Sequence, residues 1–215
     1  MKRNCAFEVI IIAGLMLAAS GARADAMFSV SLDTSAISGT TEQLVFEFID
    51  GDGVADNSVS LSNFDLGGGT VSAPADYMGT SGVGGDLSSS IAMNDTGGFA
   101  LFTQLVNFGS SLIFQMSTTN AFSGSGAPDA LSMAVYTSNF SACYSDDQVA
   151  CTLLELDLTG NALSPSSFAL NGASDQSLPA PVVTLVSAVS EPPSFLLLAL
   201  GLFGMAVGRK RLTAI

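Results

Sequence analysis

The sequence predicts an all-β body, a single antiparallel β-sandwich of jelly-roll-like form, between a signal peptide at one end and a transmembrane helix at the other. Two observations on the body carry this prediction. Apolar side chains alternate with polar ones over many short stretches, which is typical of half-buried strands. Turn-forming Gly, Asp, Asn and Ser separate these stretches, and helical periodicity is nearly absent between the two ends. We therefore divide the 215 residues into segments 1–26, 27–186 and 187–215.

The first segment has the three parts of a secretory signal peptide. Lys2 and Arg3 come first, and the apolar run Val9–Ala19 follows them. Two overlapping triplets then offer the small residues that signal cleavage needs, Ala22-Arg23-Ala24 and Ala24-Asp25-Ala26. The apolar run is shorter than the roughly 20 residues of a membrane-spanning helix, so we expect the segment to be removed during export.

Six stretches of the body show the alternation of a half-buried strand. Their apolar members, which we expect to face the core, are Phe28-Val30-Leu32, Leu44-Phe46-Phe48, Val59-Leu61, Leu112-Phe114-Met116, Leu131-Met133-Val135 and Leu154-Leu156-Leu158. Two further runs, Phe99–Phe108 and Val182–Val189, also predict strands. The Gly-, Ser- and Thr-rich stretch Gly67–Asp86 predicts a long surface loop or irregular insertion. Many short strands without intervening helices favour a sandwich.

Charge separates the body from the two ends of the chain. All six basic residues lie in or beside the end segments, at Lys2, Arg3, Arg23, Arg209, Lys210 and Arg211. Of the 19 acidic residues only Glu8 precedes Asp25, so the other 18 lie between Asp25 and Glu191, where there is no Lys, Arg or His. A body with about −18 charges and no cation cannot neutralise phosphates, which excludes nucleic acid as a partner.

The missing residue types also restrict the chemistry of the body. Without His, Lys or Arg it has no Ser-His-Asp triad, Cys-His pair, Schiff-base lysine or arginine clamp. A pair of carboxylates, as in glycoside hydrolases, is the one enzyme chemistry that remains. The sequence gives no sign of an aromatic-rich cleft beside such a pair, and we expect the body not to be an enzyme.

The acidic stretch Asp50–Asn57 lies between two predicted strands and has the form D-x-D-G-x-x-D. It is similar to part of the calcium loops of thrombospondin type 3 and dockerin modules. That resemblance implies Ca²⁺ ligands from the side chains of Asp50, Asp52 and Asp56 and from the Val54 carbonyl. The alternative is a hairpin turn without a metal ion, because Asp-Gly favours such turns by itself.

The body contains two cysteines, Cys143 and Cys151, since Cys5 leaves with the signal peptide. Export permits their oxidation, and we expect a disulfide that closes a short loop. An exposed redox pair is the alternative, but the sequence places no basic residue nearby to lower a thiol pKa.

The last segment has three parts: Ser190-Glu191-Pro192-Pro193, an uncharged run to Gly208, and Arg209-Lys210-Arg211. As a helix, residues 192–208 would reach about 25 Å, near the lower limit for crossing a bilayer core. The basic triplet that follows predicts a cytoplasmic membrane stop. The three parts together resemble the PEP-CTERM sorting signal of exported bacterial proteins, with Ser190 where the family motif has Pro.

The resemblance implies processing near Glu191-Pro192 by an exosortase, a membrane cysteine protease-transpeptidase. It also implies an inner-membrane-anchored precursor that later reaches the cell surface or the extracellular biofilm and exopolysaccharide matrix. A calcium-dependent carbohydrate-binding or adhesive module is the alternative function for the body. Permanent anchoring is the alternative for the last segment, if Ser190 prevents processing.

Overall fold

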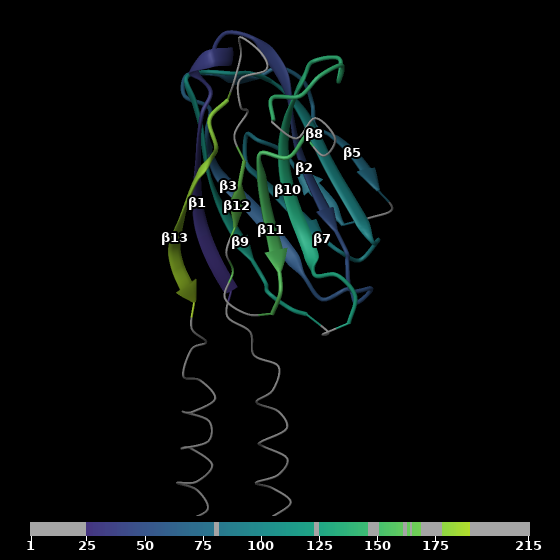
Figure 1. Cartoon of the computed structure of the whole chain (residues 1–215). Helices are drawn as coiled ribbons and strands as arrows, with labels where there is room; N and C mark the ends of the chain where they lie inside the picture. Colours follow the sequence, from purple (N-terminus) through teal and green to yellow (C-terminus); the bar gives the residue numbers. More distant parts are fainter. Residues whose placement is uncertain are drawn as a thin grey trace, which may run out of the picture. The chain divides into compact units, whose positions relative to one another are not determined.

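Hydrogen-bonded strands form two antiparallel sheets in the computed structural model of the chain (Figure 1). The structure describes residues 25–79, 82–122, 125–145, 151–160, 163, 165–168 and 178–189. A single 3₁₀ turn, η2 (Ser35–Ile37), is the helical element of this part of the chain. Sheet A has the strand order β13 (Val182–Val189), β1 (Asp25–Asp33), β9 (Ser111–Thr118), β3 (Ser58–Asp65), β7 (Ser90–Asn94) and β6 (Val83–Gly85). Sheet B has the order β12 (Ser166–Ser167), β11 (Leu154–Leu158), β10 (Asp129–Thr137), β2 (Thr41–Ile49), β8 (Phe99–Asn107) and β4 (Thr70–Val71), and β5 (Asp76–Gly79) also pairs with β8.

The core lies between the two sheets, as the alternation of apolar residues predicts. Every apolar residue of the six predicted stretches is buried, and they join one cluster. Phe46 of sheet B meets Phe114 of sheet A edge to face, with ring centroids 5.5 Å apart. All members of this cluster lie between Ala26 and Val183, so the unit Asp25–Val189 has a core of its own. The prediction of an all-β protein with two antiparallel sheets is confirmed.

The stretch Gly67–Asp86 is more regular than the predicted surface loop. It contains the three short strands β4, β5 and β6, which pair with the edges of the two sheets. Tyr77 of β5 packs against the Phe102 ring at a centroid distance of 6.1 Å, and Val83 of β6 packs against the core cluster. A few apolar anchors therefore order a segment whose composition favours a loop.

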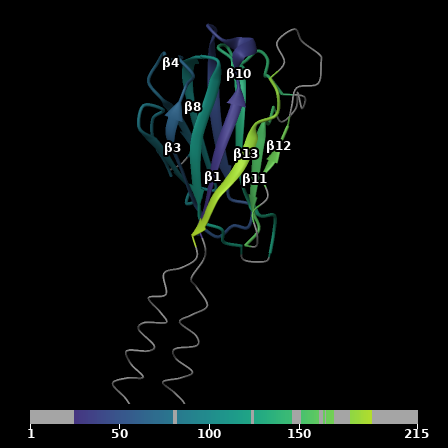
Figure 2. The ribbon, with the colours of Figure 1, turned by 90° about the vertical axis from the view of Figure 1, so that its left-hand side faces the viewer.

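The first and last described strands lie side by side at one edge of sheet A (Figure 2). β1 and β13 are antiparallel, and Asp25 is opposite Val189. The folded unit therefore extends two residues before and three residues beyond the predicted body of 27–186. Ala26 is buried within β1 and is opposite Thr118 of β9, so it belongs to the fold.

Several predicted sites lie outside the described residues. They are Ala22 and Ala24 of the cleavage triplets, the processing motif Ser190, Glu191, Pro192 and Pro193, and the membrane stop Arg209, Lys210 and Arg211. The predicted transmembrane segment lies there too. In the part of the chain that the structure does describe, no helix has the length and apolarity to span a membrane.

Candidate functional site

Five aspartates meet at one end of the sandwich, which we call the aspartate end. Asp50, Asp52 and Asp56 lie on the loop from β2 to β3, Asp95 follows β7, and Asp129 begins β10. Strand register brings these positions together. The last residue of β2 is opposite the first of β8 and the second of β10, and the first residue of β3 is opposite the last of β7.

Asp129 is the centre of this end. Its side chain is buried, with 1% of the residue exposed. Oδ1 accepts hydrogen bonds from the Gly51 and Asp52 amides at 2.8 and 3.4 Å, and Oδ2 accepts one from Asn57 Nδ2 at 2.6 Å. Gly51 is required for this approach, because a Cβ there would lie 2.2 Å from the Pro128 carbonyl oxygen. The β2–β3 loop thus folds around a carboxylate from another strand.

Asp95 is the second buried carboxylate, with 2% of the residue exposed. Its Oδ2 accepts hydrogen bonds from the Asn57 and Asp56 amides at 2.6 and 3.0 Å. Burial raises the pKa of Asp95, and the negative charge of Asp129 raises it further, while the two backbone hydrogen bonds act in the opposite direction. Ionised Asp95 is therefore less favourable here than in water.

The loop also has the turn geometry that its Asp-Gly pairs predict. Gly53 donates to Asp50 Oδ1 at 2.6 Å, and Val54 donates to Asp52 Oδ1 at 2.9 Å. Gly53 has a φ of +77°, a region that glycine adopts readily. The loop therefore turns locally as predicted, but it is not the predicted hairpin, because β2 lies in sheet B, β3 lies in sheet A and the two strands do not pair. These local turns are compatible with metal binding as well as with its absence. The Val54 carbonyl as a ligand stays a prediction.

Two groups of carboxylates in this end could hold a metal ion. One is Asp50, Asp52 and Asp129, and the other is Asp56, Asp95 and Asp129; in each group one oxygen per residue lies within 4.8 Å of the others. Oxygens on one Ca²⁺ ion at ~2.3–2.6 Å can be up to about 5 Å apart, so the spacing suits a hard cation. The three loop aspartates are thus divided between two groups that share Asp129.

Sequence reasoning identified the loop aspartates but missed Asp95 and Asp129. Asp129 stands alone in the sequence after Pro128, and Asp95 lies in a Gly-rich turn. Counting strands along the sequence could have found them, because every second turn of an antiparallel fold lies at the same end of the sheets. The number of turns can be counted only if β7 is included, a short strand whose buried Ile91 and Met93 alternate with Ser90 and Ala92 and which is not among the predicted strands.

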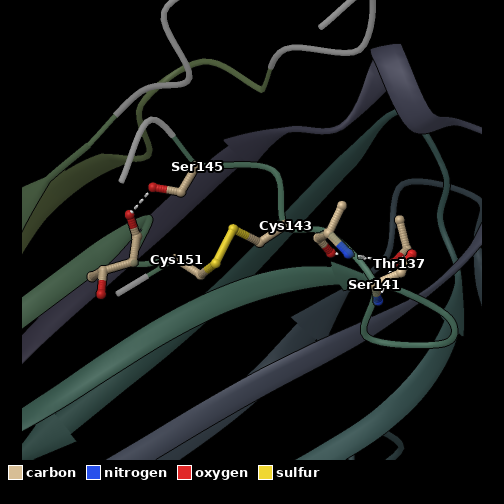
Figure 3. The surroundings of a disulfide bond; sticks show 7 residues. Thr137, Ser141, Cys143, Ser145 and Cys151 are labelled. Atoms are coloured by element: carbon tan, nitrogen blue, oxygen red, sulfur yellow. Dashed lines mark hydrogen bonds between the residues drawn. A yellow bond between two sulfur atoms is a disulfide. The ribbon is translucent and has the colours of Figure 1, made fainter. Parts of the chain in front are cut away.

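The predicted disulfide joins Cys143 to Cys151, with an S–S distance of 2.01 Å and a Cα–Cα distance of 5.7 Å (Figure 3). It lies at the opposite end of the sandwich, which we call the cystine end. There the backbone of Cys143 forms an isolated antiparallel β-bridge with Tyr136, near the end of β10. Both cysteines are buried, which favours a structural clip over an exposed redox pair. Burial, together with a hydrogen bond to Glu42 and its negative charge, raises the pKa of Tyr144 to about 12.

The Thr137 hydroxyl organises the turn beside the disulfide. Its Oγ1 accepts hydrogen bonds from the Ser141 and Ala142 amides, both at 3.1 Å, and donates to Asn139 Oδ1 at 3.0 Å. Ser145 donates its hydroxyl to the Thr152 carbonyl across the clipped loop (Figure 3). The cystine end is therefore held by a covalent bond, by neutral hydrogen bonds and by the hydrogen bond between Tyr144 and the buried carboxylate of Glu42.

A hollow in the surface of the described residues lies away from the aspartate cluster. It has a volume of about 530 Å³ and lies beyond the far end of β3, between Phe64–Val71 and Leu87. Its wall includes a single carboxylate, that of Asp65. No family model, no curated protein and no solved structure matches the chain.

Proposed function

We propose that this chain is an exported protein of the cell surface or the extracellular matrix, whose β-sandwich serves a structural or adhesive role without catalysis. The observation that carries the proposal is the extent of the folded unit. Asp25–Val189 begins and ends where the two predicted targeting segments meet the body. The disulfide of the cystine end supports an oxidising compartment. The repeated passage of the chain between the sheets, as in β1–β2–β3 and β7–β8–β9–β10, supports a jelly-roll-like form.

The fold favours one of the two signal-cleavage triplets. Cleavage after Ala26 would remove the first two residues of β1, and Ala26 is buried against β9. Cleavage after Ala24 leaves β1 whole and keeps Asp25 opposite Val189. We therefore assign cleavage to Ala22-Arg23-Ala24.

The other end of the chain carries the proposed sorting step. Val189 is the last residue of β13, and Glu191-Pro192 follows almost at once. An exosortase would cut there and separate the body from the membrane segment. The exopolysaccharide or biofilm matrix is then the expected destination.

The intact mass of the protein, measured by fraction from its native host, tests this proposal. We expect a species outside the inner membrane that begins at Asp25, ends near Glu191 and is about 2 Da lighter than its reduced form because of the disulfide. A species that keeps Pro193–Ile215 in the membrane fraction would contradict exosortase processing. A species that keeps Met1 would contradict signal cleavage.

Calcium binding at the aspartate end is the second candidate function, as part of a calcium-dependent carbohydrate-binding or adhesive module. Two buried carboxylates, Asp95 and Asp129, face a loop with three more, and the unit Asp25–Val189 contains no Lys, Arg or His to balance them. Backbone amides and Asn57 offset part of this charge. A divalent cation would offset more of this negative charge and would link the β2–β3 loop to β10.

Thermal unfolding of the unit Asp25–Val189 with Ca²⁺ or EDTA tests this candidate. We expect Ca²⁺ at 100 times its Kd to stabilise the protein by about 2.7 kcal/mol. Asp52→Asn should abolish the shift if the ion lies in the first group, and Asp56→Asn should abolish it if the ion lies in the second. Asp65→Asn, the same charge change at the other end of β3, should keep it. An equal melting temperature with Ca²⁺ and EDTA would exclude the calcium site without affecting the sorting proposal. Retention on the host exopolysaccharide, lost with EDTA, would identify the adhesive role.

A further inference from the structure

One edge of the two sheets differs from the others. β12 and β4 have two residues each, β6 has three, and β5 has four. β13, at the edge of sheet A, has eight residues and among the described residues pairs only with β1. Short edge strands are a common protection against pairing with other chains, and β13 lacks it.

The composition of β13 makes this edge a good template for another strand. Its sequence, Val-Val-Thr-Leu-Val-Ser-Ala-Val, has no charge, no proline and no glycine. Val182, Leu185 and Val186 are 66%, 55% and 52% exposed, and they are three of the ten large apolar residues exposed in the described structure. Uncharged segments of high β-propensity at an open edge pair readily with extended chains.

We propose that β13 pairs with β13 of a second copy, which joins two A sheets into one continuous sheet. The mature chain has no terminal segment left to cover this edge, because cleavage after Ala24 and near Glu191 leaves only a few residues beyond β1 and β13. The distribution of charge also favours β13 as the surface on which two copies can meet. A body with 18 acidic residues repels its own copies almost everywhere, but β13 carries none of them.

Antiparallel pairing about a two-fold axis at Thr184 matches the exposed side chains to one another. It places Val182 opposite Val186 of the second copy, and Val183 opposite Leu185. A bulge lies at Val186, where the β1 register shifts between Met27 and Phe28. The regular part of the contact is therefore short, and we expect a dimer that dissociates on dilution.

The same geometry sets a condition on where the dimer forms. Antiparallel strands place the two Val189 residues at opposite ends of the joined sheet. Two precursors held in one membrane by their last segments cannot meet this way. This condition rests on the proposed function, as does the argument that no terminal segment covers the edge, and it restricts assembly to released bodies.

Sedimentation equilibrium of the unit Asp25–Val189 tests the pairing. We expect a concentration-dependent mass between one and two bodies, shifted toward two by added salt, which screens the acidic surfaces. Thr184→Lys should give a monomer, since two lysines then meet at the axis. Ser29→Lys, which changes the neighbouring β1 residue opposite Thr184, should keep the dimer.

Three results would overturn the pairing. A monomer at every concentration and salt level would exclude it. A dimer that persists in Thr184→Lys, and in Val182→Lys as a second test, would place the contact elsewhere. If Ser29→Lys weakened the dimer as much as Thr184→Lys, the contact would lie on the face of the sheet and not at its edge. Slow amide exchange throughout β13 in a monomer would show that the chain covers its own edge.

Cross-linking through Thr184→Cys tests the restriction to released bodies. Released bodies should form the linked dimer, whereas the full chain in lipid vesicles should not. Linkage in both would contradict the opposite placement of the ends. Linkage in released bodies together with an unprocessed chain in the native host would refute the sorting proposal and leave the pairing intact.

Discussion

The two ends of the sandwich hold their loops by different physical means. β10 begins at the aspartate end with Asp129 and finishes at the cystine end with Thr137, about 27 Å away at roughly 3.4 Å per residue. At the first end, buried carboxylates accept hydrogen bonds from the backbone of the β2–β3 loop. At the second, a disulfide and the Thr137 hydroxyl hold the turn.

The difference determines what each end responds to. Charged acceptors respond to pH, ionic strength and cations, since each of these changes the energy of a buried carboxylate. The disulfide responds to reductants and the Thr137 hydroxyl is neutral, so the hydrogen bond between Tyr144 and Glu42 is the charged contact described at this end. One molecule therefore has an end held mainly by buried carboxylates, which its ionic surroundings can tune, and an end held mainly by a disulfide, which reductants can open.

Removal of Asp129 should have the largest effect. Asp129→Ala removes the side-chain acceptor of the Gly51 amide and the nearest of the three acceptors of Asn57 Nδ2, and we expect a loss of about 3 kcal/mol in the free energy of unfolding. Urea unfolding at neutral pH measures it. Asp157→Ala, at an exposed residue of β11, should change stability by less than about 0.5 kcal/mol. Equal effects in the two variants would show that Asp129 does not organise its end.

Loss of the disulfide should come second and should spare the aspartate end. The chain-entropy model gives about 2.5 kcal/mol for a loop of this length. We expect that loss in the variant Cys143→Ser with Cys151→Ser. Amide exchange at Gly51 and Asn57 should stay slow relative to that at Ser141 and Ala142. Faster exchange at both ends alike would contradict their independence.

A smaller effect, with a defined sign, should follow from Asp95→Asn. The raised pKa of Asp95 means that its contribution to stability is present at low pH and is lost as pH rises through the folded pKa. Asparagine keeps an oxygen that can accept the two backbone hydrogen bonds, and it cannot ionise, so the stability that ionisation of Asp95 removes is retained. We expect a gain of up to about 1 kcal/mol at pH 7 without divalent cations, and none at pH 3. Unfolding free energies at the two pH values, with EDTA present, measure it.

Most of the core followed from the sequence, whereas two of the five aspartates at the aspartate end did not. Alternation is a local pattern, so Phe28, Phe46 and Leu131 could be assigned to the core from their neighbours alone. The position of Asp129 beside Gly51 depends on contacts 78 residues apart in the chain. The disulfide could be predicted because only two cysteines lie outside the predicted signal peptide. Features that depend on neighbouring residues could therefore be predicted from the sequence, whereas sites formed by residues far apart in the chain could not.

The adjacency of Asp25 and Val189 has a mechanical consequence. A force that pulls the two ends of the body apart acts on antiparallel neighbours at the same end, so it opens β1 and β13 like a zipper. Hydrogen bonds then break one after another, and little force is needed at any moment. The sandwich would yield first by peeling of β13, while β9, β3 and the aromatic contacts of Phe46 and Phe114 stay in place. A force applied to the chain beyond Val189 therefore acts first on the β1–β13 pair.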